Sequence, residues 1–366
     1  KAKDAYFWDV DGNKFIDLIC GWGPMILGYN NPIIDKAAQE QYSLGNTVSV
    51  ASPVMIELAE TLVDTVEIAE WALFGKNGGD STQLAVMISR QETGKGKVLK
   101  IDGGYHGANG WMQREGSPGT IDSDSSEVIS IPWNNIEEFD SAISTFENEI
   151  ACFISSPFHH PTSEDNILPK KGYWEHIQKV CNEKNIIIIV DDVRTGFRID
   201  LAGSNKAFNF SPDLVCLGKA IANGYPISAL VGKNYLKEAA NKVYFSGTQF
   251  FNSAPMAAAI ATINELKNID ATSLMNHHGN DLKNKMISMA KSFDVDLRVT
   301  GVPSMPYFRI ENDDKELHFK WVDNCLAKGI YMTSYHNHFL SAVHRESEID
   351  LIVSLASKAF EEILEV

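Results

Sequence analysis

Two ionisable residues stand at the ends of two apolar runs in the middle of the chain. Residues 186–190 lead directly into Asp191, and residues 214–217 lead through one glycine to Lys219. Such uninterrupted apolar runs are typical of buried strands in a parallel sheet, and open α/β sheets bind ligands at the carboxyl ends of their strands. The spacing therefore predicts that Asp191 and Lys219 reach the same crevice.

A lysine and an aspartate in one crevice have the chemistry that pyridoxal 5'-phosphate (PLP) requires. A lysine amine forms a Schiff base with the cofactor aldehyde, and a carboxylate facing the pyridine nitrogen keeps that nitrogen protonated. Either residue alone is more often a solvated side chain or a helix cap, so the hypothesis depends on the pair. We assign Lys219 to cofactor attachment and proton transfer, and Asp191 to sustaining the electron sink.

The sequence around both residues resembles the class III PLP-dependent aminotransferases of fold type I. Residues 190–198, Val-Asp-Asp-Val-Arg-Thr-Gly-Phe-Arg, are similar to their Asp-Glu-Val strand and turn, and residues 217–226 are similar to their lysine segment. Residues 8–17 look like the start of these enzymes. Residues 22–28, Trp-Gly-Pro-Met-Ile-Leu-Gly, are close to the string found in glutamate-1-semialdehyde 2,1-aminomutases. The resemblance runs nearly end to end and implies PLP-dependent amino transfer.

A glycine turn between a predicted strand at 71–74 and a helix start is the candidate phosphate site. Turns of this kind aim backbone N–H groups and the positive helix end at an anion. Residues 74–82 resemble the family's Asn-Ser-Gly-Thr-Glu-Ala stretch, which implies phosphate contacts from the backbone of Gly79 and Asp80. Because the Asp80 side chain is negative, we expect it to point away or cap the helix while its N–H donates.

Further cofactor contacts follow from the same resemblance. Residues 103–107 resemble the family's aromatic turn, so Tyr105 is expected to stack on one cofactor face, with His106 beside it and Val193 on the other face. In family members a Gly-Thr such as Gly247-Thr248 reaches the phosphate of the neighbouring subunit. Thr248 therefore predicts a homodimer with a composite active site.

The predicted substrate pocket contains Trp22, His159 and His336. Departures from the aminomutase pattern at residues 156–161, at Asp192 and at His336 favour an aminotransferase that uses a separate amino donor and carbonyl acceptor. The alternative is intramolecular transfer of the aminomutase type. An inactive PLP-fold regulator is a second alternative, and it would be expected to lose Lys219 or Asp191. No arginine is assigned to a substrate carboxylate, and the substrate stays open.

Strand-like and helical segments alternate along the chain, which predicts an α/β fold with a mostly parallel, doubly wound sheet. We expect residues 46–270 to form a large PLP-binding domain and residues 271–366 a small α+β domain to which residues 1–45 contribute. Predicted strands at 71–74, 98–101, 127–131, 151–155, 186–190 and 214–217 form the sheet. Further strands are expected at 296–300, 305–310 and 330–333, before a closing helix at 346–364.

Composition excludes some classes of partner. The chain has 366 residues and a formal net charge of −16, without the basic clusters that nucleic acids and anionic membranes require. No apolar run approaches the length of a membrane helix. Five scattered cysteines without a Cys-x-x-Cys motif favour a reducing cytoplasm. The His-His pairs lack the spacing of a metal site, so we expect no metal. What precedes Lys1 is unknown.

Overall fold

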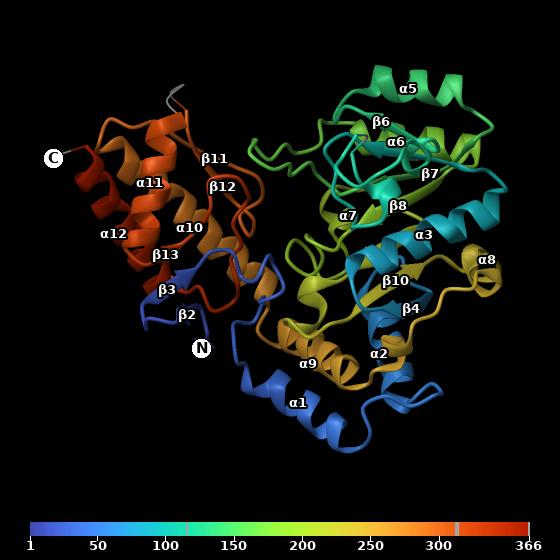
Figure 1. Cartoon of the computed structure of the whole chain (residues 1–366), viewed down its shortest axis with the longest axis horizontal. Coiled ribbons are helices and arrows are strands. Elements are labelled where there is room, and N and C mark those ends of the chain that lie inside the picture. Colours follow the sequence, from blue (N-terminus) through green and yellow to red (C-terminus); the bar gives the residue numbers. More distant parts are fainter. Residues whose placement is uncertain (115, 312–314, 365–366) are drawn as a thin grey trace. The chain divides into compact units, whose positions relative to one another are not determined.

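The computed structural model describes residues 1–114, 116–311 and 315–364, which fold into two compact units (Figure 1). The first unit contains residues 1–35, 160–167 and 264–366, and the second contains residues 36–159 and 168–263. The domain bounds expected from sequence, 46–270 and 271–366 with 1–45, stay a prediction, and the sequence does not single out residues 160–167. The candidate residues for the cofactor lie in the second unit.

The second unit is built on a seven-stranded sheet with the order β4-β10-β9-β8-β7-β5-β6. Its strands are parallel to one another except β10, which runs antiparallel to both β4 and β9. The strands are β4 (Trp71–Gly75), β5 (Lys97–Ile101), β6 (Val128–Ile131), β7 (Ile150–Ser155), β8 (Ile187–Asp191), β9 (Leu214–Leu217) and β10 (Ser228–Gly232). The predicted α/β class is thus confirmed, and β10 is the strand that the apolar pattern missed.

Helices cover both faces of this sheet because its central strands are apolar on both sides. Cys152 and Ile154 of β7 pack in a core beneath helix α3, whereas Phe153 between them contacts Phe139 and Trp174 on the other face. Alternate strand residues point to opposite faces, which explains the split. The helices of this unit are α1 (Pro32–Ser43, which begins in the first unit), α2 (Pro53–Thr65), α3 (Gly78–Thr93), α4 (Asp122–Ser125), α5 (Ile136–Thr145), α6 (Tyr173–Lys184), α7 (Ser204–Ala207), α8 (Lys237–Lys242) and α9 (Ala254–Asn268, which ends in the first unit).

The first unit is an α+β layer with its own core around Trp321 and Phe360, whose rings stack at 5.0 Å. A four-stranded sheet has the order β1-β2-β3-β13, and β11 pairs antiparallel with β12. Its elements are β1 (Ala2–Lys3), β2 (Tyr6–Trp8), β3 (Lys14–Asp17), α10 (Ala271–Lys291), β11 (Leu297–Thr300), β12 (Tyr307–Ile310), α11 (Lys315–Ala327), β13 (Ile330–Tyr331) and α12 (Glu346–Ile363).

Residues 160–167 belong to the first unit because ionic and polar contacts hold them there. Arg309 donates to both Asp165 oxygens, from Nε at 2.9 Å and from Nη2 at 2.8 Å. The Asn166 amide donates to the Met305 carbonyl at 3.1 Å, and its backbone N–H donates to Thr300 Oγ1. These partners lie far along the chain, which explains why local sequence gave no sign of the segment.

Candidate active site

The sheet brings Asp191 and Lys219 to one edge. Asp191 is the last residue of β8 and is paired in register with Cys216 of the neighbouring parallel strand β9. Lys219 follows three residues later, as the first residue of a short 3₁₀ turn. Both therefore lie at the carboxyl ends of adjacent parallel strands, where this class of sheet binds ligands.

Hydrogen-bonding contacts from His106 and Val193 hold the Asp191 carboxylate. His106 Nδ1 lies 2.7 Å from Asp191 Oδ2, and the Val193 N–H donates to Asp191 Oδ1 at 3.2 Å. The aspartate is 6% exposed and the histidine 3% exposed. His106 is itself fixed, because Thr82 Oγ1 donates to its carbonyl at 2.6 Å. His106 is thus placed to orient the carboxylate of Asp191. From sequence we expected only that His106 would lie beside Tyr105 at the cofactor.

The Lys219 side chain lies in an environment that favours its neutral amine. Burial is the main cause that lowers the Lys219 pKa to about 8. The positive charges of Arg194 and Arg198 lower it further, whereas the negative charge of Asp191 raises it. The backbone of Lys219 has φ of 43°, a left-handed conformation uncommon for residues with a side chain. Such conformations gather at functional sites, where the surrounding fold maintains them.

The glycine turn after β4 forms a helix start suited to an anion. Within the described chain, the Gly78 and Gly79 N–H groups have no hydrogen-bond partner. The Asp80 carboxylate accepts the N–H groups of Lys76 and Asn77, both at 2.8 Å, so this side chain caps the turn as expected. The Asp80 N–H donates to the Asn77 carbonyl at 2.9 Å. Gly79 is therefore the better placed of the two predicted phosphate donors.

Val193 packs directly between this turn and the lysine segment. A Cβ on Gly78 would lie 2.7 Å from Val193 Cγ1, and a Cβ on Gly218 would lie 3.2 Å from the same atom. Glycine at both positions therefore allows Val193 to pack directly against the two backbones. The site offers PLP four contacts: Val193 for the flat ring, the helix start for the phosphate, an acid for the pyridine nitrogen and a desolvated lysine for the aldehyde. This set of groups fits PLP.

Tyr105 and Thr248 are both accessible. Tyr105 is 64% exposed, which excludes the alternative that it fills the core beside its turn. Its position next to His106 leaves the ring available to a cofactor. Thr248 begins a short 3₁₀ turn and is exposed, as a residue that serves a neighbouring subunit would be. The roles of both residues stay predictions.

Asp192 does not face the substrate region, contrary to the expectation from sequence. It is 1% exposed, accepts the Thr195 hydroxyl at 2.5 Å and accepts the Ser204 N–H at 3.0 Å. Neighbouring residues at a strand end point to opposite sides, so Asp191 and Asp192 cannot share one crevice. Asp192 instead fixes the turn that follows β8, and burial raises its pKa.

The three predicted pocket residues divide between the units. His159 follows β7 in the second unit and stacks on Trp133 at 6.0 Å. Trp22 and His336 belong to the first unit, where their rings meet edge-on at 4.9 Å. His336 is 6% exposed and its Nδ1 lies 2.7 Å from the Asn337 carbonyl, whereas Trp22 is 40% exposed. Their roles in the pocket stay predictions.

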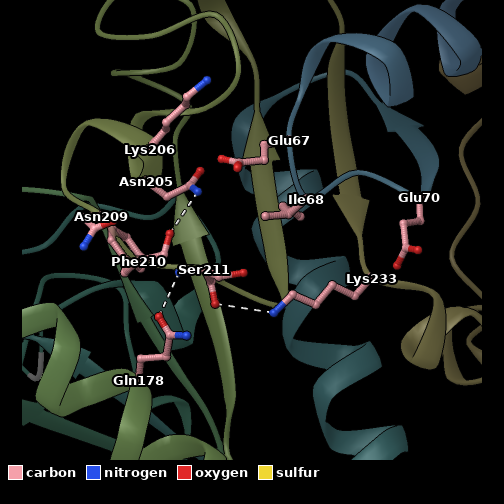
Figure 2. A pocket seen from close by; sticks show the side chains of 10 residues that line it. All are labelled: Glu67, Ile68, Glu70, Gln178, Asn205, Lys206, Asn209, Phe210, Ser211 and Lys233. Carbon is pink, nitrogen blue, oxygen red and sulfur yellow. Dashed lines mark hydrogen bonds between the residues drawn. The ribbon is translucent and has the colours of Figure 1, made fainter.

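A separate cavity of about 770 Å³ lies at the opposite edge of the large sheet (Figure 2). Lys233 lines it and follows Gly232, which pairs with the first residues of β4 and β9. Lys233 donates to the Ser211 carbonyl at 3.4 Å and to Asp213 Oδ1 at 3.1 Å. This cavity is not the PLP site.

Among the described residues, no group of three or more potential metal ligands lies together, and no helix could span a membrane.

Sequence reasoning missed the contact between His106 and Asp191 and the two cations near Lys219. For the contact between His106 and Asp191, the local sequence offered one sign, which is the position of His106 next to Tyr105. Arg194 and Arg198 stand in the quoted segment after Asp191, but their effect on Lys219 depends on how the turn folds back. Burial lowers the pKa of Arg194 to about 10.

Comparison with known proteins agrees with this geometry. The family model for class III aminotransferases matches residues 1–346. The chain is 34% identical to the aminopentol aminotransferase of Sphingopyxis macrogoltabida, over 100% of this chain and 86% of that protein. It is 31% identical to the glutamate-1-semialdehyde 2,1-aminomutase of Methanocaldococcus jannaschii, over 99% of this chain and 90% of that protein.

Solved structures extend the likeness to three dimensions. The PLP internal aldimine form of the FumI protein of Sphingopyxis sp. MTA144 superposes with a TM-score of 0.96 at 34% identity, covering 100% of this chain and 88% of that one. An omega-transaminase from Sphaerobacter thermophilus has the same fold, with a TM-score of 0.90 at 21% identity over 99% of this chain and 90% of that one. The chain therefore belongs to the class III aminotransferases, PLP-dependent enzymes of fold type I.

Proposed function

We propose that the chain is an intermolecular aminotransferase in which Lys219 carries PLP and moves the proton during transfer. The observation that carries the proposal is the meeting of a desolvated lysine, with a pKa near 8, and a buried, histidine-bound Asp191 at one sheet edge. Bound PLP supplies an electron sink for negative charge at the carbon that bears nitrogen. The Asp191 carboxylate keeps the pyridine nitrogen protonated, and Lys219 Nζ accepts and returns the substrate proton.

The remaining residues of the site hold the cofactor. The Gly79 N–H and the α3 helix start bind phosphate, and Asp80 fixes the turn that presents them. Tyr105 and Val193 enclose the ring from its two faces. Trp22, His159 and His336 shape the space for the substrate.

The attachment site is tested by borohydride reduction of the holoenzyme and peptide mapping. The label is expected on Lys219, and Lys219→Ala is expected to abolish both the label and turnover. Lys76 is the matched control, because burial lowers its pKa to about 8 as well and it lies in the phosphate turn. Lys76→Met is expected to retain the label. A label on Lys76 or any other lysine contradicts the assignment.

Transfer between two molecules is favoured over intramolecular transfer. The relatives named above include an aminotransferase at 34% identity and an aminomutase at 31% identity. The aminotransferase proposal predicts ping-pong kinetics, in which one amine releases a carbonyl product before an added keto or aldehyde acceptor takes the nitrogen. Conversion of glutamate-1-semialdehyde to 5-aminolevulinate without a second substrate would show the aminomutase reaction instead.

A homodimer with shared active sites completes the proposal. Exposed apolar side chains gather along residues 42–56, including Leu44 at 81% and Val50 at 68% exposure, and such patches typically mark interfaces. Thr248 is expected to contact the phosphate bound in the partner subunit. Lys219→Ala and Thr248→Ala would then inactivate different sites, and refolding the two variants together is expected to restore part of the activity. No recovery, together with a monomeric mass by light scattering, contradicts the composite site.

We also propose a cytoplasmic location, supported by five cysteines that are all buried and form no disulfide in the described chain. Cell fractionation tests it, and recovery of the protein in a secreted or periplasmic fraction contradicts it.

A further inference from the structure

Residues 160–167 form a strap that is fixed to the β11–β12 strand pair of the first unit. Arg298 of β11 and Arg309 of β12 are paired in register, so two positive residues stand opposite each other on the ladder. Like charges in this position destabilise a strand pair. Asp165 of the strap offsets the repulsion, because Arg309 donates to both of its carboxylate oxygens and Arg298 Nε lies 3.4 Å from its Oδ2. The strap and the strand pair therefore stabilise each other.

The strap holds the backbone of a bend at residues 334–336. Ser163, two residues before Asp165, donates its N–H to the Tyr335 carbonyl at 2.7 Å. The backbone of Ser163 has φ of 64°, a left-handed conformation that is uncommon for residues with a side chain. Such a conformation persists where surrounding contacts maintain it, and Asp165 is fixed only two residues away. Loss of the ion pair is thus expected to release the strap from Tyr335.

Strand β12 contacts the same bend at the preceding residue. Tyr307 of β12 donates its hydroxyl to the Ser334 carbonyl at 2.8 Å. Tyr307 and Arg309 are two residues apart on this strand, so their side chains lie on the same face. The bend is therefore held at two consecutive carbonyls, directly by Tyr307 and through the strap by Arg309.

The bend carries part of the predicted substrate pocket. His336 meets Trp22 edge-on at 4.9 Å, and the Tyr335 ring lies 6.3 Å from Trp22. Tyr335 is 47% exposed and Trp22 is 40% exposed, so both rings are accessible to a ligand. The position of Tyr335 and His336 relative to Trp22 depends on the bend, and the bend depends on the strap.

We propose that the ion pair between Asp165 and Arg309 positions the bend at residues 334–336 and thereby sets the affinity of the enzyme for its amino donor. The inference rests on the proposed aminotransferase function and deepens it. Asp165 and Arg309 are positioning residues that act through Tyr335 and His336 without contacting the substrate. The residues proposed for proton transfer belong to the other unit, so the ion pair is expected to affect binding rather than the chemical step.

Half-reaction kinetics test the effect on binding. The holoenzyme is mixed with alanine, 3-aminobutyrate, sec-butylamine and 1-phenylethylamine, and the donor that reacts fastest with the wild type is used for all variants. The loss of the visible absorbance of lysine-bound PLP gives a saturating rate and a half-saturation concentration. Asp165→Asn is expected to raise the half-saturation concentration about three- to tenfold, the effect of a charged hydrogen bond partly exposed to solvent. The saturating rate is expected to stay within about twofold of the wild type.

Further variants assign the effect to the ion pair. Glu311→Gln is the matched control, because Glu311 accepts from Arg298 on the same ladder at 2.8 Å but lies outside the strap. It is expected to keep both wild-type values. Arg309→Lys keeps the charge without the paired donors, so its half-saturation concentration is expected to lie between those of the wild type and Arg309→Gln. The double variant Asp165→Asn/Arg309→Gln is expected to be no worse than the more affected single variant, because the two residues act as one pair.

Hydrogen–deuterium exchange tests the same inference without turnover. The amides of residues 160–167 and 333–340, several of which are hydrogen-bonded, are expected to exchange at least about fivefold faster in Asp165→Asn than in the wild type. The amides of α3, in the other unit, are expected to exchange at the wild-type rate. Glu311→Gln is expected to match the wild type in all three segments.

The outcomes separate the ion pair from the reaction. An unchanged half-saturation concentration in Asp165→Asn overturns the proposal, as does an effect confined to the saturating rate, and as do wild-type exchange rates. If none of the four donors changes the absorbance of the wild type, the aminotransferase function is contradicted and the exchange rates alone decide the role of the ion pair. If Asp165→Asn lacks the circular dichroism of the folded wild type, Arg309→Lys takes its place and must change the same quantities in the same direction.

Discussion

His106 Nδ1 lies 2.7 Å from Asp191 Oδ2 although 85 residues separate them along the chain. The two residues follow different strands, and both side chains are almost completely buried. A buried carboxylate needs partners to keep its charge and direction. The histidine therefore supports the aspartate, and the aspartate acts on the cofactor.

His106→Phe is expected to slow amino transfer about 10- to 100-fold while PLP stays attached to Lys219. The change keeps a ring but removes the contact to Asp191 Oδ2, while the Val193 N–H still donates to Asp191 Oδ1. Half-reaction rates measure transfer, and visible absorbance measures attachment. The matched control is His176→Phe, since His176 makes a 2.7 Å contact with Asp140 on the surface. Equal rates in the two variants would contradict the positioning role.

Asp191→Asn is expected to retain PLP but slow proton transfer by a few kcal/mol of barrier. Asparagine keeps the shape of the side chain and removes its charge, so the pyridine nitrogen loses its ionic partner. Single-turnover rates with a reactive amino donor measure the effect. Combining the change with His106→Phe is expected to add little, because the histidine acts through the aspartate. Near-normal rates in Asp191→Asn would exclude the electron-sink role.

Local sequence predicted most of the large sheet because its central strands are buried on both faces. The run at 186–190 corresponds to β8 (Ile187–Asp191), and that at 214–217 matches β9 (Leu214–Leu217). Strand β10 (Ser228–Gly232) is just as buried but runs against its neighbours, a direction that composition does not reveal. Residues 160–167 needed the pairing of Asp165 with Arg309, which only the folded chain shows.

The sequence predicted the parts of the candidate site for which a residue's type and its place at a strand end or helix start suggest its role. Asp191 and Lys219 follow from strand ends, and the Asp80 cap follows from helix physics. Alternation along the strand could have shown that Asp192 faces away from Asp191. The contact between His106 and Asp191 joins loops after different strands, and no spacing rule predicts it.

Gly78→Ala is expected to weaken PLP binding about tenfold or more. The added Cβ would lie 2.7 Å from Val193 Cγ1, a separation that forces either the phosphate turn or Val193 to shift within the proposed PLP site. Equilibrium titration of the cofactor-free protein with PLP measures the affinity. Gly96→Ala is the control, because the nearest atom to its Cβ is Glu127 Oε2 at 3.5 Å. The double variant Gly78→Ala/Val193→Ala is expected to recover affinity, and failure to recover would contradict the steric explanation.

The rate of PLP attachment to the cofactor-free protein is expected to rise with pH and to level off above a midpoint near pH 8. The neutral amine is the nucleophile, and burial followed by the charge of Arg194 lowers the Lys219 pKa from 10.5 to about 8. Arg194→Met removes the second cause, so its midpoint is expected to move to higher pH. Stopped-flow absorbance measures the rate, with Lys76→Met as the background. A wild-type midpoint above pH 10 would contradict the desolvated lysine.

The first unit is expected to lose stability in acid because of His338. This side chain is 0% exposed, and its Nε2 accepts the Thr333 N–H at 3.4 Å, which requires a neutral ring. Burial, followed by the charge of His336, lowers its pKa from 6.5 to about 3. Below about pH 6.5 the unfolded chain therefore binds a proton that the folded chain does not.

The free energy of unfolding is expected to fall as the pH drops from 6.5 towards 3, by up to a few kcal/mol. Urea unfolding of the wild type, His338→Phe and His277→Phe at pH 7.5, 6.0 and 5.0 measures the slope. His338→Phe removes the buried imidazole and is expected to flatten this dependence. His277 is exposed on α10, so its variant is expected to keep the slope of the wild type. Identical slopes in all three proteins would show that His338 does not bind the proton linked to unfolding.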